Sequence, residues 1–127
     1  MMRGGSLEGG MPLWKHNTNI LFTALQNIIF KTYLSEYHSG FRAYSAKLLK
    51  TIPFEENSDS YVFDSEIIIQ ILRHNFRIDE IPIRTRYFQE TDSLGFLACL
   101  GYGVDILKML FKYFLHEKGI WQFKQFK

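Results

Sequence analysis

Apolar residues recur at three- and four-residue intervals in several segments of the chain, which is the pattern of an amphipathic helix. The pattern predicts helices over residues 12–34, 62–75 and 96–115. A shorter helix is expected over residues 46–52, because Pro53 follows it and the residue before a proline disfavours helical backbone. Four helices are therefore expected.

Two other segments alternate between positions that would face opposite sides of a β-strand. The shorter covers residues 41–45 and the longer covers residues 77–88, where Pro82 is typical of an edge strand. Helices combined with strands predict the α/β fold class. Because a sheet normally has more than two short strands, we expect the chain to be the C-terminal part of a larger α/β domain.

The composition suits one compact domain of 127 residues, since 46% hydrophobic and 22% charged residues exclude wholesale disorder. The 15 basic and 13 acidic residues leave a net charge of only +2, so no nucleic-acid partner is expected. The single cysteine, Cys99, excludes a disulfide framework and fits a reducing compartment. The 12 phenylalanines point to a surface that meets lipid or a missing domain.

Any membrane attachment is expected at the bilayer surface rather than across it. Residues 94–115 are long enough to span a bilayer, but they contain Asp105, Lys108 and Lys112. Each of these charges would cost about 2.5 kcal/mol or more at the bilayer centre. The last helix could instead lie in the membrane surface, as could the first, with a basic and aromatic tail at residues 118–127.

The segment of residues 36–42 is the first candidate site. Glu36, His38 and Arg42 supply a carboxylate, an imidazole and a guanidinium at a loop-to-strand junction. Such loops commonly carry catalytic groups, and a carboxylate there can take a proton from an attacking hydroxyl or help to hold a cation. The alternative is a polar turn in which Gly40 meets a backbone requirement.

Two pairs of residues are candidates for binding phosphate. Arg84 and Arg86 stand at alternate strand positions, about 7 Å apart on one face, which suits two planar forks on one phosphate. The alternative is a solvated edge strand whose charges deter aggregation. Lys15 and Asn19 lie near the start of the first helix, where an anion is favoured, and ordinary capping is the alternative.

No metal site is predicted within the chain. Asp64 and Glu66 look like an Asp-x-Asp motif, but residues two apart on a helix do not face each other. The four histidines show no ligand spacing. Glu66 alone could point into a cleft; the alternatives are a surface charge or a pairing with a nearby arginine.

Four segments occur in an order that carries a family resemblance: residues 9–15 (Gly-Gly-Met-Pro-Leu-Trp-Lys), 34–45 with Ser-Gly-Phe-Arg, 61–66 (Tyr-Val-Phe-Asp-Ser-Glu) and 78–87 with Ile-Pro-Ile-Arg-Thr-Arg. Together they resemble the C-terminal half of a family-two glycosyltransferase, in the branch like dolichol-phosphate mannose synthase. The resemblance covers nearly all of the chain.

The resemblance implies a partial GT-A fold, which is a nucleotide-binding α/β sandwich, with amphipathic interfacial helices. It also implies transfer of a sugar from a nucleotide-sugar, with inversion, to an acceptor such as polyprenyl phosphate. The complete enzyme would hold a divalent cation, Mg or Mn, through an Asp-x-Asp motif in its N-terminal half. Because this chain has no such motif, we expect residues 1–127 to lack the donor-binding half and to hold no cofactor. Residues 94–127 are expected to form an amphipathic helix and a basic tail.

By resemblance, Glu36 matches an acid on the acceptor side of the cleft and is the candidate catalytic base or neighbour of the metal site. Arg42 matches the arginine of the Ser-Gly-Phe-Arg segment, where it would bind acceptor or phosphate. Glu66 matches the acid of the following helix, and it would line the cleft together with His38.

The remaining roles implied by the resemblance concern phosphate. Lys15 and Asn19 belong to the interfacial helix that helps to hold the acceptor phosphate in related enzymes. Arg84, Arg86 and Ser93 fall in a loop that folds over the donor or acceptor phosphate. All five residues are therefore expected to contact phosphate.

The sequence thus predicts a C-terminal fragment of an inverting glycosyltransferase that is inactive alone. It is expected in the cytoplasm, peripheral at the cytoplasmic membrane face, with a separate N-terminal half or a second copy as partner. The alternative is a non-catalytic membrane-surface or partner-binding module derived from such an enzyme.

Overall fold

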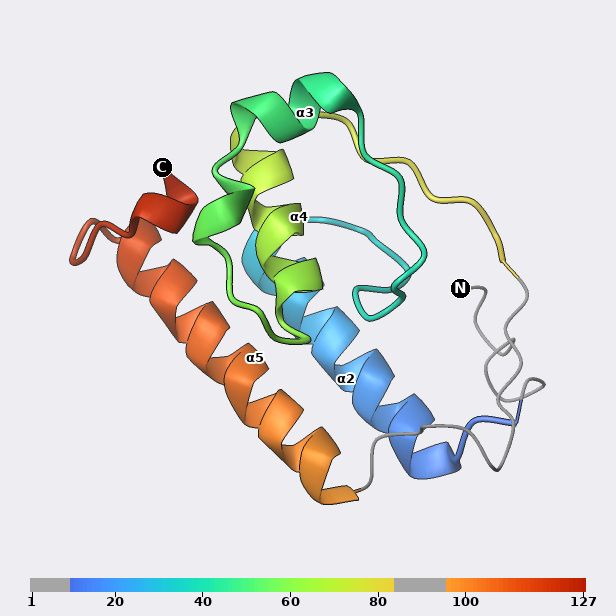
Figure 1. Cartoon of the computed structure of the whole chain (residues 1–127). Coiled ribbons are helices and arrows are strands. Elements are labelled where there is room, and N and C mark those ends of the chain that lie inside the picture. The colour runs from blue at the N-terminus through green and yellow to red at the C-terminus, as the bar shows by residue number, and fades with distance from the viewer. Residues whose placement is uncertain (1–9, 84–95) are drawn as a thin grey trace. The chain divides into compact units, whose positions relative to one another are not determined.

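The computed structural model describes residues 10–83 and 96–127, and these residues form helices joined by irregular segments (Figure 1). The α-helices lie where the apolar periodicity predicts them, to within a few residues at each end. The elements in chain order are α2 (Leu13–Phe30), α3 (Ala46–Thr51), the 3-10 turn η1 (Phe54–Glu56), α4 (Phe63–Arg73), α5 (Phe96–Glu117) and the 3-10 turn η2 (Lys124–Phe126).

The predicted α/β fold class is wrong, because no strand forms anywhere in residues 10–83 and 96–127. Residues 41–45 and 77–83 are irregular, and the rest of the second predicted strand lies outside the described residues. Alternating side chains are compatible with a strand, but a strand also requires ladder hydrogen bonds to a neighbouring extended segment. Residues 41–45 and 77–83 make no such ladder within the described chain, so a partial GT-A sandwich is not the architecture of the described residues.

The chain divides into two compact units. The described part of the first unit contains α2, the irregular segment after it and the segment that begins at Asp79, up to Cys99 in the first turn of α5. The second unit contains Gly40–Ile78 and Leu100–Lys127.

One side chain, that of Asn27, organises the end of α2. Its carboxamide donates to the Leu34 carbonyl at 2.8 Å and accepts the Leu34 N–H at 3.0 Å. The same Oδ1 accepts the hydroxyls of Thr32 and Tyr37, each at 2.9 Å. Lys31 adopts a left-handed backbone at φ 56°, which turns the chain out of the helix. The helix therefore ends at Phe30 and not at residue 34.

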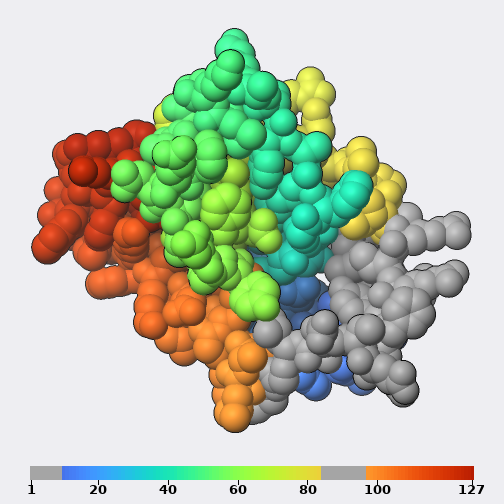
Figure 2. All heavy atoms as spheres, in the orientation of Figure 1, coloured from blue at the N-terminus to red at the C-terminus, as the bar shows by residue number. Residues whose placement is uncertain are grey.

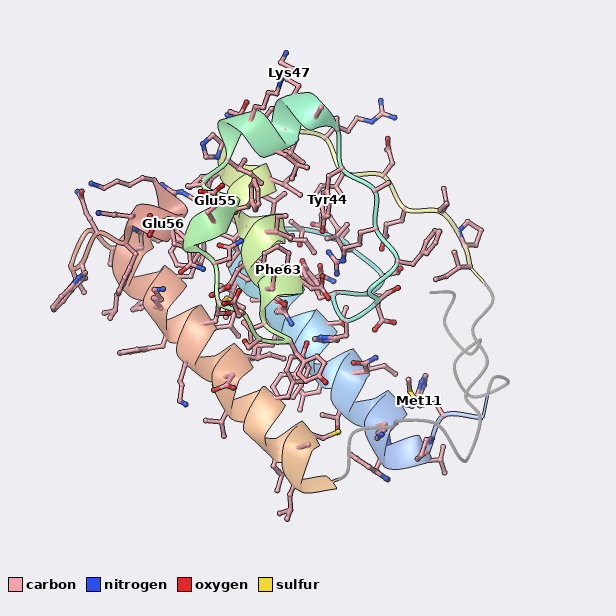
Figure 3. All side chains as sticks on the ribbon, in the orientation of Figure 1. Met11, Tyr44, Lys47, Glu55, Glu56 and Phe63 are labelled. Carbon is pink, nitrogen blue, oxygen red and sulfur yellow. The ribbon has the colours of Figure 1, made fainter. Side chains whose placement is uncertain are left out.

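The core of the second unit lies between α3 and α4. Leu48 and Ile52, in and just after α3, form a buried cluster with Ile67 and Ile71 of α4. Partly buried aromatic and aliphatic residues pack around this cluster; they are Tyr44, Leu49, Phe54, Phe63, Phe76 and Ile78. Figure 3 shows Tyr44 before α3 and Phe63 at the start of α4, while Lys47 points outward from α3. The short α3 is fixed at its start by Ser45, whose hydroxyl accepts the Leu48 N–H at 3.2 Å.

A buried amide cluster connects α4 to the end of the chain. The Nε2 group of Gln70 lies within 2.9 Å of the Pro53 carbonyl, the Asn57 Oδ1 and the Gln125 carbonyl. Asn57 donates in return to Gln70 Oε1 at 3.1 Å, and the Gln125 side chain donates to Asn57 Oδ1 at 3.1 Å. Gln70 is fully buried, so these bonds replace the water that the amide would otherwise bind.

Residues 118–127, called the C-terminal strap below, are held against the second unit. Gln125 and Phe126 are buried, and the Phe126 ring makes edge contacts with the Tyr113 and His116 rings, both at 5.6 Å between centroids. The ammonium of Lys112 lies over the Phe126 ring at 5.7 Å and donates to the Gln125 carboxamide. The strap is therefore a packed part of this unit.

The last helix, α5, is apolar on two faces. It buries one face through Ile106, Met109 and Leu110. The apolar stripe that the sequence shows most strongly is on the exposed face, and its exposed members in the second unit are Leu100, Val104, Leu107, Phe111 and Phe114. These five residues, called the α5 stripe below, are each at least half exposed. Figure 2 shows α5 atoms, in orange, at the molecular surface. In the described chain, no helix has the length and apolar character needed to cross a membrane.

The amide cluster predicts a large effect of one substitution, Gln70→Leu. Leucine has a similar size, but it leaves the Pro53 and Gln125 carbonyls and the Asn57 amide without this partner. We expect the free energy of unfolding to fall by about 2–3 kcal/mol, as for buried polar groups that lose their hydrogen bonds. Chemical denaturation followed by circular dichroism measures this change.

The matched control is Gln122→Leu, because Gln122 lies exposed in the strap. This substitution should change the free energy of unfolding by less than about 0.5 kcal/mol. Equal effects of the two substitutions would contradict a stabilising role of the amide cluster.

Candidate functional site

In the first unit, the predicted catalytic residue Glu36 lies against α2. Its Oε1 accepts a hydrogen bond from Asn19 Nδ2 at 2.7 Å, and its side chain is partly buried. Asn19 is positioned by the regular backbone of α2, whereas Glu36 lies in the irregular segment after that helix. The structure therefore brings together two residues that the sequence singles out separately.

Lys15 lies one helical turn before Asn19, so the two side chains share a face of α2. The Lys15 ammonium lies 5.4 Å from the centre of the Trp14 ring, a cation–π contact that holds the charge near the start of the helix. His38, two residues after Glu36, is partly buried. A carboxylate, an amide and an ammonium thus lie along one helix and the segment that returns to it.

A second hydrogen bond pattern fixes the segment that carries Glu36. The Ser35 N–H donates to both carboxylate oxygens of Glu80, at 2.9 and 3.0 Å, and the Ser35 hydroxyl donates to Glu80 Oε1 at 2.8 Å. Tyr37 is fully buried and packs edge-on against Phe30 at 5.8 Å. Glu36 is therefore flanked on both sides by residues with fixed partners.

Arg42 belongs to the second unit, where it pairs with Asp64. Its Nε lies 3.5 Å from Asp64 Oδ1, and its Nη1 donates to the Asp64 carbonyl at 3.3 Å. Burial raises the pKa of Asp64 above its ordinary value, and the Arg42 charge opposes this rise. Burial also raises the pKa of the neighbouring Tyr44, again against the effect of Arg42. Arg42 therefore has a structural partner at the start of α4.

Glu66 is buried in α4 and holds the loop before that helix. Its Oε2 accepts the Ser58 N–H at 2.7 Å and the Ser58 hydroxyl at 2.8 Å. The Ser58 hydroxyl also lies 3.1 Å from that of Ser60. These bonds give Glu66 a role as an acceptor for the loop, which favours a structural position over a surface charge.

The other predicted phosphate ligands, Arg84, Arg86 and Ser93, lie outside the described residues. The candidate residues that are described divide between the two units. Asn19 and Glu36 are brought together in the first, along with Lys15 on the same helix, and Arg42 and Glu66 lie in the second.

The described residues do not fit a divalent cation. Within residues 10–83 and 96–127, no three side chains of His, Cys, Asp or Glu come together as ligands. The two acids that look like a metal motif in sequence have other partners, since Asp64 faces Arg42 and Glu66 faces Ser58.

Sequence reasoning missed the partners that fix these residues. Asp64 is weighed in sequence only as a metal ligand, and Glu80 and Tyr44 are not singled out. Asp64 and Glu80 bind residues 22 and 45 positions away in the sequence, and periodicity does not report contacts at such separations. One partner could be found from local sequence. Asn27 lies near a helix end, where an asparagine side chain typically binds nearby backbone groups.

No protein-family model and no solved structure matches the chain. Curated relatives do match, and they include the following two proteins. An uncharacterised protein of Methanocaldococcus jannaschii is 30% identical over 107 residues, which cover 84% of this chain and 42% of the relative. The UDP-N-acetylglucosamine–dolichyl-phosphate N-acetylglucosaminyltransferase of Methanococcus voltae is 26% identical over 102 residues, which cover 80% of this chain and 41% of that enzyme.

The comparison supports a distant link to a glycosyltransferase. The matched regions amount to about two fifths of the length of each relative. The dolichol-phosphate mannose synthase branch that the sequence resembles stays a prediction.

Asp64→Asn tests the burial of the Asp64 charge. A raised pKa means that the folded state binds a proton more readily than the unfolded chain does. As the pH falls from neutral toward the ordinary pKa of 3.8, the native chain should therefore gain stability relative to the Asp64→Asn variant. Urea denaturation of both proteins across this range measures the difference.

Asp59→Asn is the control, since Asp59 is exposed in the preceding loop. The difference in the free energy of unfolding between Asp59→Asn and the native chain should change less with pH. If the native chain instead loses stability relative to Asp64→Asn on acidification, the attraction of Arg42 outweighs burial.

Proposed function

We propose that this chain is part of a glycosyltransferase that transfers a sugar from a nucleotide-sugar to a polyprenyl phosphate, with inversion at the anomeric carbon. The observation that carries the proposal is the match to an enzyme whose name specifies UDP-N-acetylglucosamine and dolichyl phosphate. The match spans 80% of this chain, so it includes most of the segments that carry the family resemblance.

The chemistry requires an oxygen of the acceptor phosphate to attack the anomeric carbon while the bond to the nucleoside diphosphate breaks. A phosphate monoester already carries about −1.5 to −2 charges at neutral pH, so its attacking oxygen has no proton to lose. Glu36 is then a positioning residue that holds Asn19. Only with a hydroxyl acceptor would Glu36 take a proton as a base.

Lys15 supplies the positive charge that a phosphate acceptor needs on α2. Asn19, one turn later, is tied to Glu36 at 2.7 Å, so it fixes the irregular segment beside the helix face that carries Lys15. Arg84, Arg86 and Ser93 are proposed as further phosphate ligands. The donor and a divalent cation would bind to a part that this chain does not supply, either a separate N-terminal half or another chain.

The proposed acceptor is a lipid, so we place the chain at a membrane surface and propose its cytoplasmic face. The α5 stripe supports this position, because it presents apolar and aromatic side chains to solvent. Ile120 and Trp121 of the strap are also exposed, beside the basic Lys118. A helix of this kind can bury its apolar face in the headgroup region while lysines meet anionic lipid.

A non-catalytic module that binds a membrane surface is the second candidate function. It is favoured by the same exposed stripe of apolar side chains on α5. Both candidates predict lipid binding, so an activity measurement must separate them.

The activity prediction concerns Lys15 and Glu36. The chain is co-expressed with the part of the Methanococcus voltae enzyme that lies outside the matched residues, and transfer of labelled N-acetylglucosamine to dolichyl phosphate is measured. We expect transfer only when both parts are present. Lys15→Ala should raise the KM for dolichyl phosphate roughly tenfold or more, as expected for a lost charge-assisted contact.

Glu36→Gln separates the two possible roles of Glu36, since glutamine can still accept the Asn19 hydrogen bond. With a phosphate acceptor, kcat should fall less than about tenfold, whereas loss of a general base costs 100-fold or more. Lys31→Ala, at an exposed position after α2, is the control for charge. No transfer in the combined system, with both parts folded, would favour the non-catalytic module.

The membrane prediction concerns the α5 stripe. Co-sedimentation with phosphatidylglycerol vesicles should retain the native chain, and Leu107→Glu or Phe111→Glu should weaken binding roughly tenfold or more. The expected loss reflects about 1.5–3 kcal/mol for each large apolar side chain that no longer enters the membrane.

Tyr33→Glu is the matched control, because Tyr33 is almost fully exposed and lies outside the stripe. This substitution should leave vesicle binding within about twofold of the native value. Equal losses for all three variants would mean that added negative charge, and not the stripe, controls binding.

A further inference from the structure

His116, in the last turn of α5, joins the helix to the strap through a hydrogen bond that depends on its protonation state. The backbone N–H of Phe123 donates to His116 Nδ1 at 3.0 Å, so Nδ1 must carry a lone pair. The ring also makes a hydrogen bond with the Phe126 backbone and an edge contact with the Phe126 ring. The neutral imidazole thus contacts both ends of residues 123–126.

Protonation of this ring would place an N–H at Nδ1, where it would face the Phe123 N–H. Two donors cannot satisfy each other, so the bond between α5 and the strap would be lost. The strap would keep its contacts at Gln125 and Phe126, which include the bond from Gln70 and the packing against Tyr113. The expected result is weaker docking of the strap rather than global unfolding.

We propose that His116 is a pH-sensitive latch, whose protonation weakens the docking of the C-terminal strap, residues 118–127, on α4 and α5. The proposal is independent of the glycosyltransferase function, since it concerns only contacts within the second unit.

The charges around the ring come from each packed element. Burial is the main cause that lowers the pKa of His116, and Arg73 of α4 and Lys127 of the strap lower it further. Glu117 and the hydrogen bond with Phe126 act in the opposite direction. The charge of Lys112, also in α5, lies over the Phe126 ring, 5.7 Å from the ring centre.

The direction of the pH effect follows from this lowered pKa. Because the docked strap favours the neutral ring, docking is fully stabilised above the ordinary pKa of 6.5 and weakens as the pH falls below it. Each unit of difference between the docked and released pKa values corresponds to a tenfold change in the docking equilibrium.

Amide hydrogen exchange of the strap tests the latch on the full chain. After correction for intrinsic exchange rates, we expect the protection of residues 123–126 to fall about threefold or more between pH 8 and pH 5. The protection of α4 over the same range should change much less. Constant protection of the strap in the native chain would overturn the proposal.

Two variants assign the effect to one ring. In His116→Asn, the side-chain oxygen can accept the Phe123 N–H at every pH, so the pH dependence of strap protection should disappear. His74→Asn is the matched control: the Nδ1 of His74 lies 2.9 Å from the Gln70 carbonyl, a bond that protonation preserves, and this variant should behave like the native chain. A pH dependence that persists in a folded His116→Asn variant would also overturn the proposal.

Discussion

The second unit depends on the buried carboxamide of Gln70. A single side chain in α4 connects the loop after α3, through Pro53 and Asn57, to the strap at Gln125. An apolar residue at this position would form none of these hydrogen bonds, so it would fix neither the loop nor the end of the chain. The hydrophobic cluster between α3 and α4 supplies packing, and the amide cluster determines which segments close over it.

The helices could be predicted from sequence because their signals are local. Apolar spacing locates α4 and α5, and Pro53 limits α3. The predicted strands do not form in residues 41–45 and 77–83, since alternation describes one side of a pairing and says nothing of a partner. The end of α2 shows the same limit at short range, because Asn27 binds Leu34 and stops the helix before the apolar pattern ends.

The sequence predicts individual residues of the candidate site but not the contacts between them. Sequence singles out Asn19 and Glu36 for different reasons, and their hydrogen bond appears only when α2 and the following segment are in place. Arg42 was expected at a phosphate, whereas its observed partner is Asp64, 22 residues later. Partners at such separations follow from tertiary packing, which neither periodicity nor a short motif encodes.

The two apolar faces of α5 are subject to different constraints on natural variation. Ile106, Met109 and Leu110 lie in close-packed surroundings, where even a change of one methylene is felt, so their size and shape should be restricted. Residues of the exposed face, such as Leu107 and Phe111, are at least half exposed, so packing restricts their shape less. They can exchange freely among large apolar types as long as a fluid or adaptable surface covers them. Related sequences would therefore hold one face of this helix nearly constant in volume while the opposite face keeps only its hydrophobicity.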